Sequence, residues 1–168
     1  MIAKITNRVQ IKKNIIRETI KNIEDLNNFV TKVGFNQGGK VGTPIKSGDK
    51  PALSSMSEVS QIATKLEFGP VGKKRKSWPF MTQSFADGVP KVKSLINQTM
   101  PLIIDGKLDA FRALGLYGEL HQDQIKTKIR DMKSPPLEQV TIDKKKSSNP
   151  LIDTGQMIQS VGHVEGKR

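Results

Sequence analysis

The sequence predicts a mixed α+β domain that is mostly helical. Apolar residues recur at spacings of three and four over several long segments, which is the period of an amphipathic helix. Two short segments, TKVGF and SVGHVEG, have the β-branched or alternating character of strands. Hydrophobic residues make up 35% of the 168-residue chain and aromatic residues only 5%, so we expect a small core and extended loops that become ordered on assembly.

The first predicted element is a helix over about residues 9–33 that ends near Gly34. Its charged side chains fall largely away from its apolar face. That face consists of Ile16, Ile20, Ile23, Leu26 and Val30. The segment TKVGF then begins a strand. Residues 35–57 are rich in Gly, Pro, Ser and Lys and show no helical period, which predicts a loop or a long hairpin.

Two further helices are predicted in the middle of the chain. The shorter one begins after Ser57, whose side chain can cap it, and stops before Pro70. The longer one covers residues 80–104. Because it contains Pro90 and Pro101, we expect it to be broken or kinked.

The strongest predicted helix covers residues 107–132. Gly115 and Gly118 lie along its apolar side, and each costs roughly 1 kcal/mol relative to Ala inside a helix. We therefore expect a neighbouring backbone to approach that face closely. A short amphipathic turn or helix is expected over residues 137–146, followed by a polar linker, a capped turn and the strand SVGHVEG.

The composition excludes several classes of protein. The chain has no cysteine, which excludes disulfides and thiolate metal sites, and its two histidines are too few for a typical zinc site. No apolar run approaches the ~20 residues that span a membrane, and the N-terminus lacks the apolar core of a signal peptide. We therefore expect a soluble, single-domain protein without a cofactor that is made in a cytoplasm.

The net charge of +12 is spread along the chain, which suits attraction to a polyanion or to an acidic protein surface. The densest basic run consists of Lys73, Lys74, Arg75 and Lys76. It lies next to Trp78 and Phe80, and cations interleaved with aromatic rings are typical of proteins that bind single-stranded nucleic acid. The other interpretation is a solvated basic loop followed by an anchoring aromatic pair.

The segment NPLIDTGQM contains the Asp-Thr-Gly triplet of aspartic proteases. Such an enzyme needs two carboxylates that share a proton, so a chain with one triplet would have to dimerise. Gln156 follows the triplet where retroviral proteases have Ala or Ser, and the surrounding pattern is helical. We favour a second interpretation, in which Asp153 or Thr154 caps a helical turn that starts at Gly155.

A second partial motif, GFNQGGKV, fits the first seven positions of a phosphate-binding loop. Val41 stands where that loop needs a Ser or Thr to hold magnesium, so a flexible glycine loop is the favoured interpretation. His121 has no Ser, Cys or paired carboxylate near it in the sequence. No catalytic constellation is left, and we expect no enzymatic activity.

Three stretches in order carry a resemblance: IATKLEFGP, WPFMTQSF and PPLEQVTIDKKKSSNPLIDTGQMIQSV. Together they resemble the tail-completion and neck proteins of tailed bacteriophages, a family related to a lambdoid phage tail component. The resemblance covers about residues 57–162, although Lys76-Ser77-Trp78 stands where the family has Pro-Ala-Arg. The positions that match the family motifs, and to which we assign roles in assembly, are Glu67, Phe68, Gly69, Pro79, Phe80, Pro136, Leu137, Pro150, Leu151, Asp153, Thr154, Gly155 and Ser160.

The resemblance implies an α+β subunit with long helices packed on a small antiparallel β-sheet. It also implies a structural virion protein of the phage neck or tail terminus, made in the bacterial cytoplasm, that forms a homo-oligomeric ring around the DNA channel. The partners would be the neighbouring connector, neck, tail-terminator and tail-tube proteins, through the loops at 35–57 and 69–78. The basic residues would face packaged DNA or an acidic ring. The alternative is a basic nucleic-acid-binding accessory protein.

Overall fold

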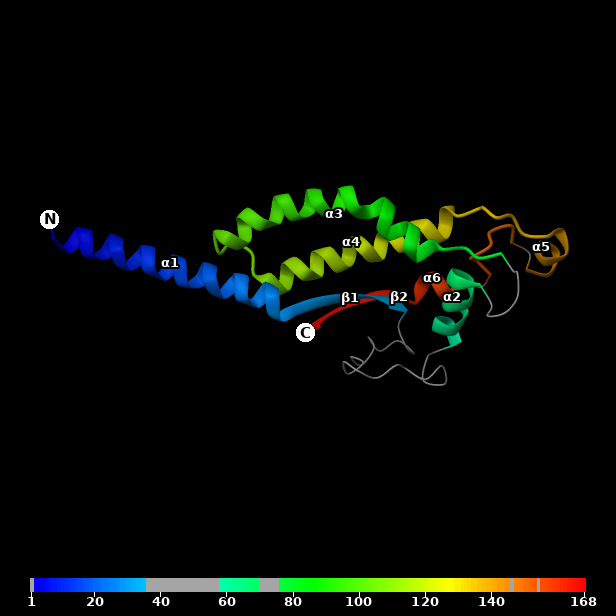
Figure 1. Ribbon diagram of the computed structural model, residues 1–168, viewed down its shortest axis with the longest axis horizontal. Helices are drawn as coiled ribbons and strands as arrows, with labels where there is room; N and C mark the ends of the chain where they lie inside the picture. Colours follow the sequence, from blue (N-terminus) through cyan, green and yellow to red (C-terminus); the bar gives the residue numbers. More distant parts are fainter. Residues whose placement is uncertain (1, 36–57, 70–75, 146, 154) are drawn as a thin grey trace.

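The computed structural model describes residues 2–35, 58–69, 76–145, 147–153 and 155–168 (Figure 1). In chain order the elements are α1 (Ile2–Asn28), β1 (Phe29–Phe35), α2 (Glu58–Phe68), α3 (Phe80–Ile104), α4 (Ala110–Asp131), α5 (Gln139–Lys145), α6 (Gln156–Gln159) and β2 (Val161–Lys167). The fold is α+β with a small antiparallel sheet, as expected. Of the loop predicted over residues 35–57, Phe35 belongs to β1 and residues 36–57 lie outside the described residues, as do the basic residues 73–75.

The long helices lie side by side with the sheet in an elongated molecule. Helices α3 and α4 form an antiparallel hairpin, and α4 packs on the two strands (Figure 1). Helices α2, α5 and α6 gather at one end of this arrangement. At the other end α1, which runs directly into β1, projects past the tip of the α3–α4 hairpin.

The two strands pair along their whole length, from Phe29 opposite Lys167 to Phe35 opposite Val161. Alternate residues of a strand point to opposite faces, so the odd-numbered residues share one face. That face lies against α4: the aromatic rings of Phe29 and Phe111 meet edge to face with their centroids 5.8 Å apart. The sheet therefore covers one side of α4.

A polar cluster is enclosed between α4 and the sheet. His163 Nδ1 lies 2.7 Å from Gln122 Oε1, and His163 Nε2 lies 3.6 Å from Glu165 Oε1. Thr31 Oγ1 and Glu165 Oε1 are buried without a hydrogen-bond partner. The cluster fits because α4 has Gly118 here: a Cβ at this position would lie 2.6 Å from His163 Cδ2 and 2.7 Å from Thr31 Oγ1. The expected approach of a neighbouring backbone is wrong: side chains of the sheet approach Gly118 closely, and Gly115 has only an ordinary contact with Glu165.

We expect Gly118→Ala to lower the free energy of unfolding by about 1–3 kcal/mol, because the added methyl group displaces side chains that are held in the cluster. The same change at Gly115 is the matched control. There a Cβ would lie 3.6 Å from Glu165, an ordinary contact, so Gly115→Ala gains up to about 1 kcal/mol of helix propensity. Urea denaturation followed by circular dichroism measures both. A Gly118→Ala variant as stable as the parent contradicts the close packing.

The principal core lies where the α3–α4 hairpin meets α2 and the C-terminal segment. Its buried hydrophobic residues come from all of these elements, and they are Val59, Ala63, Phe80, Ile125, Ile129, Met132, Leu151, Met157 and Val161. The ring of Phe35 packs edge to face on Phe80, with the centroids 6.0 Å apart, and so joins the sheet to this core. The opposite end of the hairpin has fewer buried residues, among them Ile103, Ala110 and Ala113.

Both expected ends of the first helix are wrong, since it begins at Ile2 instead of about residue 9. The first helix ends at Asn28 instead of Val33, and the strand begins at Phe29 because this segment pairs with β2. Helix α3 is a single element that contains both Pro90 and Pro101, so of the two expected outcomes, a break or a kink, the break is absent. Figure 1 shows α3 visibly bowed, which is how a helix accommodates a proline that lacks an amide hydrogen and crowds the preceding turn.

Candidate assembly surface

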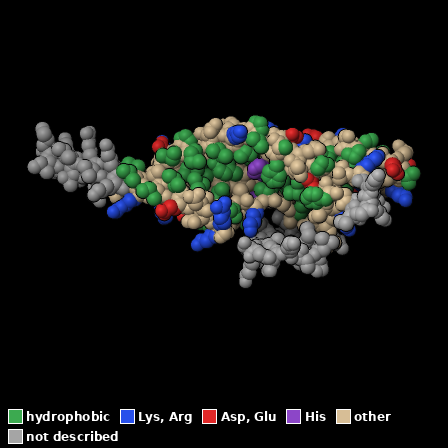
Figure 2. Space-filling model, in the orientation of Figure 1, with side chains coloured by type: hydrophobic (Ala, Val, Ile, Leu, Met, Phe, Trp, Pro, Cys, Tyr) green, Lys and Arg blue, Asp and Glu red, His purple; other side chains and the backbone are tan. Residues whose placement is uncertain are grey.

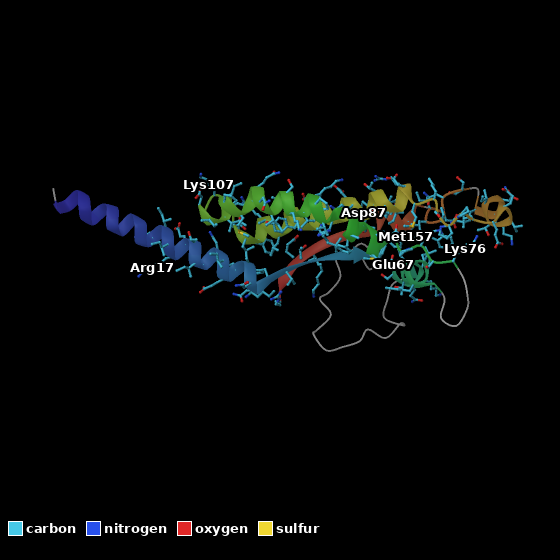
Figure 3. The ribbon with its side chains drawn as sticks, turned by 45° about the horizontal axis from the view of Figure 1, so that its top comes forward. Arg17, Glu67, Lys76, Asp87, Lys107 and Met157 are labelled. Carbon is cyan, nitrogen blue, oxygen red and sulfur yellow. The ribbon has the colours of Figure 1, made fainter. Side chains whose placement is uncertain are left out.

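The first two motif blocks, IATKLEFGP and WPFMTQSF, meet at the start of α3. The carboxylate of Glu67, at the end of α2, accepts hydrogen bonds from the backbone amides of Met81 and Thr82, both at 2.9 Å, and from Thr82 Oγ1 at 2.6 Å. Glu67 is buried, and Phe80 beside it is fully buried. These residues therefore fix the angle between α2 and α3. Figure 3 labels Glu67 at this end of the molecule and Arg17 on α1 at the other.

Trp78 ties the same joint to the segment after α4. Its backbone amide donates to the Leu66 carbonyl at 2.7 Å, and its indole Nε1 donates to the Pro135 carbonyl at 2.8 Å. Lys76 Nζ donates to the Pro136 carbonyl at 3.2 Å. The indole N–H of Trp78 therefore anchors this segment to the chain that follows α4.

The last motif block closes the C-terminal end of α4. The side chain of Asn149 donates to the Arg130 carbonyl at 2.8 Å and accepts from the Leu151 amide at 2.8 Å. Pro150 and Leu151 are buried next to it. Asn149 thus satisfies a helix-end carbonyl that has no partner within the helix. Our motif assignment did not include this residue, although the sequence NP after a polar linker is a common turn signal.

The Asp-Thr-Gly triplet does not cap α6 as expected through Asp153. Gly155 is the N-cap residue, with a φ of 79°, and has no side chain of its own to make a cap hydrogen bond. Asp153 is exposed, and Thr154 lies outside the described residues. The positive φ accounts for the glycine, because residues with a Cβ rarely adopt it. Ser160 Oγ donates to the Gln156 carbonyl at 2.8 Å and helps to close the turn.

The remaining motif residues lie at the surface. Phe68 is 76% exposed at the end of α2, and Gly69 follows with a φ of 74° that ends the helix. Pro136 is exposed and Leu137 half-buried, and Lys76 is exposed. A groove of about 340 Å³ lies between α2 and the last motif block, with Ile62, Leu66, Pro150 and Leu151 in its wall. The motif residues therefore divide into a buried joint and a smaller exposed set.

A second surface, absent from our sequence assignment, lies at the hairpin and α1. The exposed large apolar side chains of the described residues outnumber the buried hydrophobic residues. Most of them lie on α1, α3 and α4, and Figure 2 shows a broad apolar area over the α3–α4 hairpin. These residues are Ile15, Ile16, Ile20, Ile23, Phe85, Val89, Met100, Leu102, Ile104, Phe111 and Leu116. An apolar area of this extent is typical of a protein–protein contact.

His121 lies at the edge of this apolar area. Its ring is 4.8 Å from the ring of Phe85, measured between centroids. Burial lowers the pKa of His121 from its ordinary value, although a side-chain hydrogen bond with Gln124 opposes the shift. The lowered pKa favours the uncharged imidazole, which suits its place beside the apolar surface.

Comparisons with known proteins do not extend this picture: no protein-family model, no curated protein and no solved structure matches the chain. In the part of the chain that the structure describes, no group of three or more His, Cys, Asp or Glu side chains could hold a metal ion. Among the described helices, none has both the length and the apolar character needed to cross a bilayer.

Proposed function

We propose that this protein is a structural component of a tailed-bacteriophage virion, located at the neck or the tail terminus. It forms a homo-oligomeric ring around the DNA channel and docks to the adjacent connector or tail-tube ring. The ordered motifs from Glu67 to Ser160 support the family assignment.

The observation that carries the proposal of assembly is the exposed apolar surface on α1, α3 and α4. Among the described residues of a single subunit, the large apolar side chains that are exposed to water outnumber the hydrophobic residues that are buried. Burying apolar surface contributes about 25 cal/mol per Å², so contacts between subunits would stabilise this fold substantially. A closed ring with heterologous contacts can bury such a surface on every subunit.

The buried joint supports the same function in another way. The motif residue Glu67, together with Trp78 and Asn149, which lie beside motif residues, holds α2, α3 and the C-terminal segment at fixed angles. A ring subunit needs this rigidity, because small errors in its shape accumulate around the ring. The motifs would therefore act in assembly by setting the shape of the subunit.

Electron microscopy of the purified protein and of assembled virions tests the proposal. We expect closed rings of the purified protein and density for it at the head–tail junction. A protein that stays monomeric at every concentration and is absent from virions refutes it. If that monomer binds generic DNA with a steep dependence on salt, and loses binding when residues 73–76 become alanine, the accessory-protein alternative is favoured instead.

A further inference from the structure

Helix α3 carries an apolar strip that the described elements of its own chain leave partly exposed. The strip consists of Phe85, Val89, Val92, Ile96 and Met100, at spacings of four, three, four and four. Phe85, Val89 and Met100 are exposed, and Val92 and Ile96 are half-buried. Alternating spacings of three and four keep side chains on one face of a helix, which is the pattern of a seam between two packed helices.

Helix α1 carries a matching stripe. Ile16, Ile20 and Ile23 are spaced by four and three residues and are all exposed, at 58%, 51% and 45%. At 100° per residue, the charged side chains of α1 among residues 14–28, such as Lys21 and Asp25, fall on the opposite side. We call α1 the arm, because it projects past the hairpin (Figure 1).

The arm cannot lie on the strip of its own chain. Thr19 Oγ1 donates to the Ile104 carbonyl at 2.8 Å, and Asn22 Nδ2 donates to the Ile103 carbonyl at 3.2 Å. These bonds hold the arm at the C-terminal end of α3. Val89, in the middle of the strip, is about 22 Å further along α3, from the rise of a helix over the intervening residues.

The two helices that carry these surfaces are similar in length, and oppositely charged residues border the surfaces. The arm has 27 residues and α3 has 25, which correspond to lengths of about 40 and 37 Å. Glu24 borders the stripe one turn after Ile20, and Lys93 borders the strip one turn after Val89. Both charged side chains are exposed, so opposite charges would flank the apolar contact when the helices pack together.

We infer that the arm of one subunit packs along the apolar strip of the next subunit. The contact joins two different surfaces of the same chain, so it is heterologous and propagates from subunit to subunit until the ring closes. This inference rests on the ring proposed above and identifies its interface: each subunit donates an arm to one neighbour and receives an arm from the other.

Disulfide cross-linking tests this interface, because the chain contains no cysteine of its own. In the double variant Ile20→Cys/Val89→Cys, each subunit would link to two neighbours. A disulfide forms only where the Cα atoms approach to about 4.4–6.8 Å. Under mild oxidation we expect a ladder of multimers on non-reducing gels, which disappears on reduction. Both positions are exposed, so the substitutions leave the fold of the subunit intact.

The matched control is Ile20→Cys/Lys91→Cys. Lys91 is exposed two residues after Val89 and points away from the strip, so we expect no ladder. The single variants Ile20→Cys and Val89→Cys have one thiol each and are expected to stay uncross-linked. If the reduced double variant forms rings in electron micrographs but gives no ladder on oxidation, this interface is refuted and the proposed ring still stands. A protein that never assembles overturns the ring and this interface together.

Discussion

Replacing Phe80 by Ala is expected to lower the free energy of unfolding by about 3–5 kcal/mol, the range for removing a buried aromatic ring from a core. Phe80 is fully buried at the start of α3, and its ring packs edge to face on Phe35. The cavity would open where α2, α3, α4 and the sheet meet, so the surrounding side chains have little freedom to refill it. Chemical denaturation measures the loss, and the midpoint should fall without a change in slope.

Phe68→Ala is the matched control, because it removes the same aromatic ring at an exposed position of the motif. Phe68→Ala should alter the stability of the isolated subunit by no more than about 0.5 kcal/mol, as surface substitutions usually do. If Phe68 instead contributes to an assembled ring, its loss would appear in the concentration needed for assembly. Equal stability of the two variants would contradict the separation of the motif into a buried joint and an exposed set.

This division of the motif could not be predicted from the sequence. Phe68 and Phe80 are the same residue type in neighbouring motif blocks, and both were expected to act in assembly. Their burial depends on how α2 meets α3, which is determined by the hydrogen bonds from residues 81 and 82 to Glu67. The helical period identifies α2 and α3 as helices but contains no information on the angle between them.

The boundary between α1 and β1 shows another limit of local patterns. Val30 and Val33 continue the spacing of three and four from Leu26, so the helical period runs on past Asn28. The same valines are β-branched and suit a strand. The segment forms a strand because it pairs with Val161–Lys167. That partner is far away in the sequence, so the local pattern around Val30 gives no information about it.

The apolar strip of α3, in contrast, was present in the sequence. Its residues have regular helical spacing, and they are Phe85, Val89, Val92, Ile96 and Met100. The two prolines of the same segment nevertheless predicted a broken or kinked helix. A helix of this length has two apolar sides to account for: one faces α4, and the other is the strip. A helix with more apolar surface than its own domain can cover is a signal of assembly that can be read without coordinates.

Replacing Glu67 by Ala should lower the free energy of unfolding by about 3 kcal/mol, the second largest effect expected here. The carboxylate is buried and accepts three hydrogen bonds at the first turn of α3, and a hydrogen bond to a charged group contributes about 1.5–3 kcal/mol. These contributions are not additive, because water can enter and reach some of the released donors. Glu67→Gln keeps one acceptor oxygen and should lose roughly half as much.

Asp153 provides the comparison for Glu67, since it is the other acidic residue of the motif and is exposed. Asp153→Ala removes the same charge, yet should change stability by no more than about 0.5 kcal/mol. The two variants therefore separate the effect of net charge from that of the hydrogen bonds that Glu67 accepts at the first turn of α3. Thermal unfolding at fixed ionic strength gives the difference directly.

A destabilised Asp153 variant would mean that the triplet stabilises the fold in a way its exposure does not indicate. A stable Glu67→Ala variant would mean that α3 begins without help from α2, and that the joint is set by apolar packing around Phe80 alone.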